Sequence, residues 1–158
     1  MNGHHTVAIC TWEGDKQQSI EYNSSIAVGI DCPRAKLRVS ILLDTIQEYQ
    51  VRYIFSDEEI SEAVNEAGLI IGARGIAYEG VLQRKPVIVV GEYGFGGLVT
   101  PDTLHEQYNN YFRGKINGIK AEYFSLERLE EEIRRGFALT FQELQMMSNQ
   151  TIRFLHNI

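Results

Sequence analysis

Short apolar runs alternate with helix-like spacing along most of the chain. Runs at 6–10, 24–30, 51–55, 69–71 and 87–90 predict β-strands, and periodic apolar residues predict helices at 34–49 and 57–67. The runs at 69–71 and 87–90 are wholly apolar, which is typical of strands buried on both faces of a parallel sheet. The alternation therefore predicts an α/β domain with a mostly parallel sheet and right-handed crossovers.

Helix boundaries and buried faces can also be predicted. Ser56 and Glu59 fit a capping box, and Pro101 suits the first turn of a helix that continues to Phe112. From Ser125 onward one apolar stripe is too long for one ordinary helix, so we expect a break near Gly136 or around 148–149. The predicted stripes are Leu37, Ile41, Leu42 and Ile46 in the first helix, and Leu126, Leu129, Ile133, Phe137, Phe141 and Leu144 at the C-terminus. The acidic run at 127–132 predicts a solvated helix face.

Length and composition narrow the class of protein. The chain has 158 residues, of which 44% are hydrophobic and 23% charged, so we expect one soluble globular domain. The net charge is −6 and no basic stripe occurs, which argues against binding to nucleic acid or to anionic membranes. No apolar run reaches the roughly 20 residues of a membrane span, and the N-terminus lacks an export signal. We therefore expect a cytoplasmic protein in which Cys10 and Cys32 are free thiols and no metal is bound.

A glycine turn joins the fully apolar run at 69–71 to a predicted short helix. Gly72 and Gly75 would let a diphosphate approach the backbone at the positive end of this helix. Arg74 would offer a planar, permanently charged group to its oxygens. The alternative is an ordinary tight strand-to-helix turn with a solvated arginine.

One acidic residue, Glu79, lies one turn into the same helix. Its neighbours are apolar, and a carboxylate in such a place needs hydrogen-bond donors, which sugar or ribose hydroxyls would supply. Alternatively, Glu79 faces water or pairs with Arg84 or Lys85.

A second glycine-rich segment follows the run at 87–90. Gly94, Gly96 and Gly97 predict a loop that contacts a ligand or acts as a flexible lid. Ligands of parallel sheets bind beyond the carboxyl ends of strands, so the turns at 72–75 and 91–97 should line one crevice. The alternative is a surface turn whose aromatic residues, Tyr93 and Phe95, cover the core.

The run Glu79-Gly-Val-Leu-Gln-Arg-Lys-Pro-Val-Ile-Val89 resembles a segment of the GT-B glycosyltransferases. It is similar to the Glu-Ala-x-Ala-x-Gly-Lys-Pro-Val segment of their C-terminal half, and the likeness extends over residues 50–135. The resemblance implies a three-layer Rossmann-like domain that binds a nucleotide sugar. It implies that Glu79 binds the ribose, that the turn at 72–75 faces the diphosphate, and that the glycines at 94–97 border the donor sugar.

This chain departs from the family pattern in two residues and in length. Ile71 stands where many retaining members have a second glutamate, and Arg84 replaces the glycine before Lys-Pro-Val. A complete GT-B enzyme has two such halves, and 158 residues provide one. We therefore expect the whole chain to form one donor-binding domain that ends in a helical segment at 125–158, with an N-terminal acceptor-binding domain or a second copy as partner.

The resulting hypothesis is binding of a UDP-, GDP- or CMP-linked sugar for transfer to an acceptor, without a cofactor. The catalytic base would come from the missing half. A sugar-nucleotide epimerase-like fragment and a non-catalytic α/β interaction module remain as alternatives.

Overall fold

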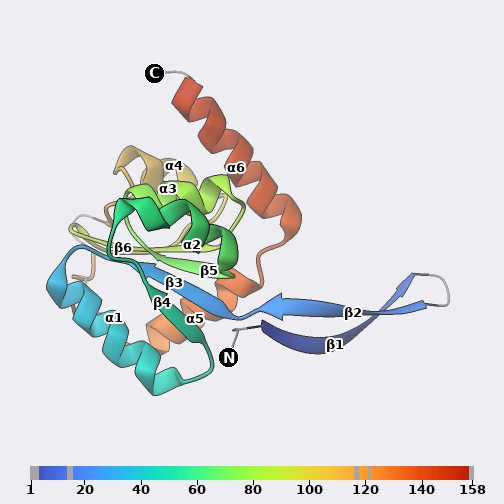
Figure 1. The fold of residues 1–158 in the computed structure, drawn as a ribbon. Helices are drawn as coiled ribbons and strands as arrows, with labels where there is room; N and C mark the ends of the chain where they lie inside the picture. The colour runs from blue at the N-terminus through green and yellow to red at the C-terminus, as the bar shows by residue number, and fades with distance from the viewer. Residues whose placement is uncertain (1–3, 14–15, 116–117, 121, 157–158) are drawn as a thin grey trace.

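A computed structural model of the chain describes residues 4–13, 16–115, 118–120 and 122–156. Its centre is a five-stranded sheet with the strand order β4-β3-β5-β6-β7 (Figure 1). Strands β3 to β6 are parallel, and β7 returns antiparallel to β6. The strands are β3 Ser25–Gly29, β4 Gln50–Tyr53, β5 Leu69–Gly72, β6 Val87–Gly91 and β7 Gly94–Leu98. The predicted mostly parallel α/β sheet is confirmed.

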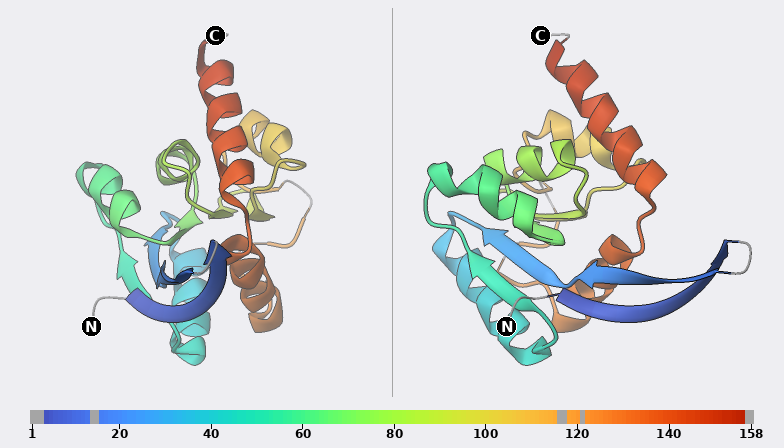
Figure 2. Two further views of the ribbon diagram at one scale, coloured as in Figure 1. Left: turned by 90° about the vertical axis from the view of Figure 1, so that its right-hand side faces the viewer. Right: turned by 45° about the vertical axis from the view of Figure 1, so that its right-hand side comes forward.

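Helices cover both faces of the sheet and form a three-layer, Rossmann-like arrangement (Figures 1 and 2). One face carries α1 Pro33–Ile46 and α5 Leu126–Phe137. The other carries α2 Ile60–Glu66, α3 Gly75–Leu82, α4 Leu104–Asn109 and α6 Phe141–His156. A single 3-10 turn, η1 Asp57–Glu59, precedes α2. None of the helices in the described residues is long and apolar enough to cross a membrane.

The central strands are apolar throughout because both of their faces are covered. In β5, Leu69 and Ile71 pack against the α1 side, whereas Ile70 packs against the α3 side, and all three are fully buried. Strand β6 repeats this alternation, with its five residues buried. The sequence-based interpretation of these runs as strands buried on both faces is confirmed.

The predicted strand at 6–10 lies in a separate hairpin. Strand β1 His4–Glu13 pairs antiparallel with β2 Lys16–Asn23, and the two form a two-stranded sheet of their own. Figures 1 and 2 show this hairpin extending from the α/β body. Strand β1 is therefore not part of the parallel sheet, and β3 is the first strand of that sheet.

Helix α1 packs on the sheet through only part of the predicted stripe, since Leu42 is buried and Ile46 packs half-buried against the same core. Its buried residues are Ala35, Val39, Leu42 and Leu43. Leu37 and Ile41 are 62% and 51% exposed. Apolar residues occur on more than one face of this helix, so their spacing did not determine which face meets the sheet.

The C-terminal segment breaks at 138–140, which confirms the expected break near Gly136. A reciprocal capping pair starts the second helix: Glu143 N–H donates to Thr140 Oγ1 at 3.1 Å, and Thr140 N–H donates to Glu143 Oε1 at 3.0 Å. Helix α6 then continues through Ser148, whose hydroxyl donates to the Leu82 carbonyl of α3 at 2.9 Å. Phe141 is 61% exposed, so the single stripe from α5 into α6 is wrong at this position.

Helix α4 is shorter than predicted. It begins at Leu104 rather than at Pro101, because Thr100 and Thr103 form a hydrogen-bonded turn before it. It ends at Asn109, and Tyr111 and Phe112 follow with left-handed φ values of 57° and 51°.

The acidic face of α5 is not wholly solvated, because Glu132 is only 2% exposed. Its carboxylate pairs with Arg128 at 3.0 Å and with Arg135 at 3.1 Å, and accepts a hydrogen bond from Leu98 N–H of β7 at 3.3 Å. These donors satisfy a buried charge that would otherwise be costly.

Helix α3 ends at Leu82, and Arg84, two residues later, has a strained backbone with φ 61°. Arg84 N–H donates to the Val81 carbonyl at 3.1 Å, and Lys85 N–H donates to the Gly80 carbonyl at 2.9 Å. This hydrogen-bond pattern usually places glycine at the left-handed position.

We expect Arg84→Gly to be more stable than Arg84→Ala by about 1 kcal/mol, because only glycine adopts this φ without a Cβ penalty. Both variants remove the contact of the guanidinium with the Phe141 ring, 6.0 Å away, so their difference isolates the backbone effect. Urea denaturation monitored by circular dichroism measures it. Equal urea midpoints for the two variants would contradict the interpretation that the backbone of Arg84 is strained.

Candidate functional site

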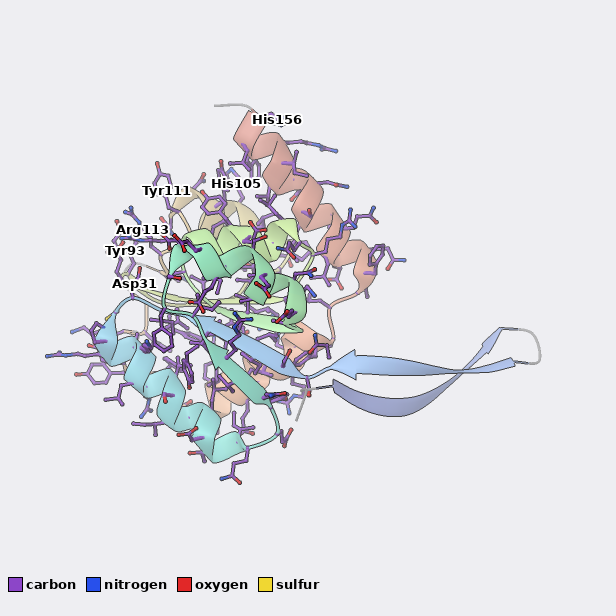
Figure 3. All side chains as sticks on the ribbon, in the orientation of Figure 1. Asp31, Tyr93, His105, Tyr111, Arg113 and His156 are labelled. Atoms are coloured by element: carbon purple, nitrogen blue, oxygen red, sulfur yellow. The ribbon has the colours of Figure 1, made fainter. Side chains whose placement is uncertain are left out.

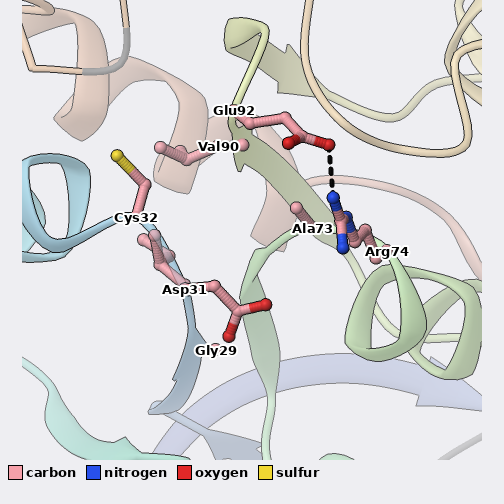
Figure 4. Close-up of a pocket in the computed structure, with 9 residues that line it drawn as sticks. Gly29, Asp31, Cys32, Ala73, Arg74, Val90 and Glu92 are labelled. Carbon is pink, nitrogen blue, oxygen red and sulfur yellow. Dashed lines mark hydrogen bonds and ion pairs between the residues drawn. The ribbon is translucent and has the colours of Figure 1, made fainter.

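A cavity of about 260 Å³ lies at the carboxyl ends of β3, β5 and β6 (Figure 4). It is lined by residues 29–32, 73–74 and 90–92. The chain passes from β3 to β4 on one side and then crosses to β5 on the other side of β3. The cavity therefore lies at the point where the strand order reverses, which is where open α/β sheets bind their ligands.

A pair of glycines lets α3 approach the sheet at this point. Gly29 and Gly72 are register partners at the ends of β3 and β5. A Cβ on Gly72 would lie 2.5 Å from the Gly29 carbonyl oxygen and 2.6 Å from Ile76 Cγ2. Ile76 of α3 therefore packs in the space that side chains at positions 29 and 72 would fill. The first turn of α3 lies close to the strand ends as a result.

Arg74 occupies the turn between β5 and α3 in an unusual backbone conformation, with φ 55° and ψ −123°. Its N–H donates to the Phe112 carbonyl at 2.9 Å, which ties this turn to the segment after α4. Hydrogen bonding within the helix begins with Tyr78 N–H to the Arg74 carbonyl. The amides of the first turn, from Gly75, thus have no partner within the helix and form its positive end.

Three charged side chains from separate segments meet at the mouth of the cavity. The Glu92 carboxylate accepts a hydrogen bond from the Arg74 guanidinium, and Arg113 Nε lies 3.1 Å from the same oxygen, Oε1 (Figure 4 shows the Arg74 contact). The hydrogen bond from Arg74 lowers the pKa of Glu92, and the same bond raises the pKa of Arg74. Both groups are therefore charged at neutral pH. Asp31 adds a second carboxylate to the cavity wall.

Backbone strain is concentrated here. Five non-glycine residues among those described have positive φ, and two of them, Gln47 and Arg84, lie just after helices. The other three are Arg74, Tyr111 and Phe112, which the Arg74–Phe112 hydrogen bond brings together. Strained residues persist where the surrounding structure holds them, and they cluster at functional sites.

The predicted glycine loop at 91–97 is instead an antiparallel hairpin. Only Glu92 and Tyr93 separate β6 from β7, and Gly94, Gly96 and Gly97 lie within β7. Packing and backbone conformation account for these glycines, since Gly94 and Gly97 have φ values of 127° and 78°, and none of the three lines the cavity. A Cβ would lie 2.7 Å from the Ile119 carbonyl oxygen at Gly94, 2.9 Å from Gln107 Oε1 at Gly96 and 3.3 Å from Glu132 Oε1 at Gly97. The two glycine turns do share one crevice, through Arg74 on one side and Gly91 and Glu92 on the other.

Glu79 lies outside the cavity lining. It is half-buried, and its carboxylate accepts a hydrogen bond of 2.7 Å from Gln83, which also donates to the Ser61 carbonyl of α2. It pairs with neither Arg84 nor Lys85. Its face of α3 is therefore directed toward the start of α2, and its ribose contact stays a prediction.

The sequence analysis does not predict Asp31, Glu92 or Arg113 as site residues. Asp31 follows the strand at 24–30, so the rule that ligands lie beyond carboxyl strand ends could have found it. Glu92 belongs to the segment predicted as a glycine loop, and that prediction gives its side chain no role. No local signal marks Arg113, because it reaches Glu92 only through the return of the chain after α4.

The described histidine side chains lie away from the cavity. His105 packs its ring on Phe154 at 5.7 Å, and His156 lies at the end of α6, on the side away from Asp31 (Figure 3). The described residues contain no group of three or more histidine, cysteine or acidic side chains that could hold a metal ion. Cys32 is a free, half-buried thiol at the start of α1, and Cys10 lies in a part of β1 for which only the backbone is described.

We expect Gly72→Ala to lower the free energy of unfolding by about 1–3 kcal/mol, because its Cβ would collide with the backbone of β3. Gly75→Ala is the matched control: its Cβ would lie 3.8 Å from Ile60 Cδ1, an ordinary contact, so stability should be unchanged or slightly higher. Chemical denaturation measures both. A similar loss in the two variants would contradict this explanation.

Comparisons of the chain with protein-family models, with curated proteins and with solved structures found no match.

Proposed function

We propose that this chain is the donor-binding half of a GT-B-like glycosyltransferase and holds a nucleoside-diphosphate sugar at the cavity between β3, β5 and β6. The observation that carries this proposal is the position of the cavity. It lies at the reversal of strand order, beside an arginine and the first-turn amides of α3. Such a combination suits a diphosphate, since the helix dipole and backbone donors favour negative charge there.

The space around Gly75 supports an approach of the ligand to the backbone. Gly72 lacks a side chain because Gly29 and Ile76 leave no room, but Gly75 has a neighbour only at 3.8 Å and no positive φ. Packing therefore does not explain a glycine at this position. A phosphate that contacts the amides of the first turn would explain it.

Glu79 lies four residues after Gly75 and hence on the same face of α3. The rise between them is about 6 Å along the helix axis. A diphosphate at the first turn would place the adjoining ribose over this face. Its hydroxyls would then replace the Gln83 donor on the Glu79 carboxylate.

The chemistry proposed is stabilisation of the leaving diphosphate. As the bond to the sugar breaks, negative charge grows on the phosphate oxygens, and Arg74 and the amides of α3 are positioned to offset it. Asp31 on the opposite wall is suited to accept hydrogen bonds from sugar hydroxyls. The acceptor and the catalytic base would come from a second domain or a second copy, and polysaccharide or glycoconjugate synthesis is the corresponding role.

The alternatives make different demands on the site. An epimerase-like fragment needs a histidine-and-carboxylate set near the sugar, whereas His105 packs on Phe154 of α6. A non-catalytic module needs only structural glycines, and Gly94, Gly96 and Gly97 meet that description. Packing does not explain the glycine at position 75 or the strained backbone of Arg74, and these two residues favour the binding role.

We expect UDP, GDP or CMP to stabilise the chain in a thermal-shift screen. At about 100 times its dissociation constant, a ligand adds about 2.7 kcal/mol to the free energy of unfolding, which corresponds to a rise of about 5–11 °C in the melting temperature.

The role of Arg74 can be tested by calorimetry. Arg74→Ala should weaken nucleotide binding about tenfold or more, because it removes a charged hydrogen-bond donor. Arg153→Ala, which removes an exposed arginine on α6, is the control. The absence of binding by any nucleotide, or equal affinities for the two variants, would refute the proposal.

The role of Glu79 can be tested with ligand pairs. The wild-type chain should bind the preferred nucleotide more tightly than its 2′-deoxy form, and Glu79→Ala should bind the two almost equally, because the ribose hydroxyl has then lost its acceptor. Glu62→Ala, on the neighbouring α2, is the control and should keep the preference. If the preference persists in Glu79→Ala, another residue holds the ribose.

A further inference from the structure

The Glu92 carboxylate occupies the place where an anionic ligand would meet the arginines. It comes from the two-residue turn between β6 and β7, and it lies at the mouth of the cavity beside the positive end of α3. Both Arg74 and Arg113 approach one of its oxygens, Oε1. A single carboxylate oxygen thus faces two guanidinium groups, and Asp31 is the other carboxylate of the cavity wall.

Arg113 has hydrogen-bonding capacity that Glu92 does not use. Its Nε atom is buried, and although it lies 3.1 Å from the carboxylate, it makes no hydrogen bond to any described residue. A buried donor without an acceptor is unfavourable. A phosphate group has more oxygens, arranged tetrahedrally, so it can meet such a donor where one carboxylate cannot.

Contacts other than those with Glu92 hold the Arg113 side chain and the backbone of Arg74. The Arg74 N–H is bound to the Phe112 carbonyl, and the Arg113 carbonyl accepts from Tyr93 N–H at 2.9 Å. The guanidinium of Arg113 also lies over the Tyr93 and Tyr111 rings, 5.7 and 5.4 Å from their centroids, and donates to the Tyr93 hydroxyl at 3.1 Å. The Arg113 guanidinium therefore keeps its position when the carboxylate leaves, and the turn that carries Arg74 stays fixed.

Glu92 itself can leave at small cost. Its side chain is 44% exposed, and Arg74 is the only described side chain that donates a hydrogen bond to it. Exposed ion pairs contribute little, because water solvates the separated charges well.

We propose that Glu92 is an internal competitor for the phosphate site, and that a bound diphosphate replaces its carboxylate on Arg74 and Arg113. This inference depends on the proposed binding of a nucleoside diphosphate, and it adds Arg113 to the ligand-binding residues. In the absence of ligand the carboxylate offsets part of the charge of the two arginines. Binding a dianionic phosphate releases Glu92 to solvent and gives Arg113 Nε an acceptor.

The test is calorimetric titration of the full chain with inorganic pyrophosphate. Glu92→Gln keeps the shape of the side chain and removes its charge, so it should bind pyrophosphate about three- to tenfold more tightly than the wild type, in line with the weakness of exposed ion pairs. Glu66→Gln is the matched control. Glu66 is an exposed carboxylate paired with Arg52 at 3.1 Å, so this variant changes the net charge equally but lies elsewhere. It should bind as the wild type does.

Arg113→Gln should bind pyrophosphate about tenfold or more weakly, because it removes a charged donor. Arg113→Lys is the more conservative variant, because it retains the positive charge and the aliphatic part of the side chain and should therefore fold. Circular dichroism checks the folding of both variants. It should also bind more weakly than the wild type, since lysine lacks the Nε–H donor. Unchanged affinity in both Arg113 variants would overturn the inference.

The outcomes separate this inference from the proposed function. If Glu92→Gln gains no affinity, or if Glu66→Gln gains as much, the competitor role is wrong, and the donor-binding function survives as long as Arg74→Ala still weakens nucleotide binding. If the wild type and Glu92→Gln bind neither pyrophosphate nor UDP, GDP or CMP, both proposals are wrong.

Discussion

The contact of Ile76 with the paired glycines Gly29 and Gly72 is the constraint on which the candidate site depends. Because neither glycine has a Cβ, α3 can lie directly over the ends of β3 and β5. This approach brings the positive end of α3 and the Arg74 turn to the reversal of strand order. A larger residue at either glycine would lift the helix and separate the amides from the cavity. The packing of one isoleucine therefore determines where the first turn of α3 meets the strand ends.

Much of the fold was predictable because its signals are local. Runs such as 69–71 and 87–90 carry enough apolar residues to be assigned to buried strands, and Ser56 with Glu59 marked a helix start that the structure contains. The failures occurred where tertiary contacts decide. The exposed face of α1 could not be distinguished from the buried one, and Glu132 looked solvated although Leu98 and two arginines surround it.

The candidate site was predictable only in part, for the same reason. Gly72 and Arg74 stand in one continuous turn, so their position after a strand indicated a crevice. Arg113 comes to Glu92, which lines that crevice, through backbone hydrogen bonds such as Arg74 N–H to the Phe112 carbonyl, which join segments nearly forty residues apart. No spacing in the sequence encodes such a contact. Gly94, Gly96 and Gly97 show the opposite error, because glycines that β7 needs for packing resembled a ligand loop.

The two edge strands of the five-stranded sheet, β7 and β4, differ in how far their outer edges are covered. At one margin β7 folds back onto β6, and Phe95 N–H donates to the Ile119 carbonyl, which covers part of that edge. At the other margin β4 has only four residues and carries Arg52, whose guanidinium pairs with Glu59 and Glu66. A short strand bearing charge is a poor template for addition of a foreign strand. The free border of the sheet is thereby protected against edge-to-edge aggregation when the protein is concentrated.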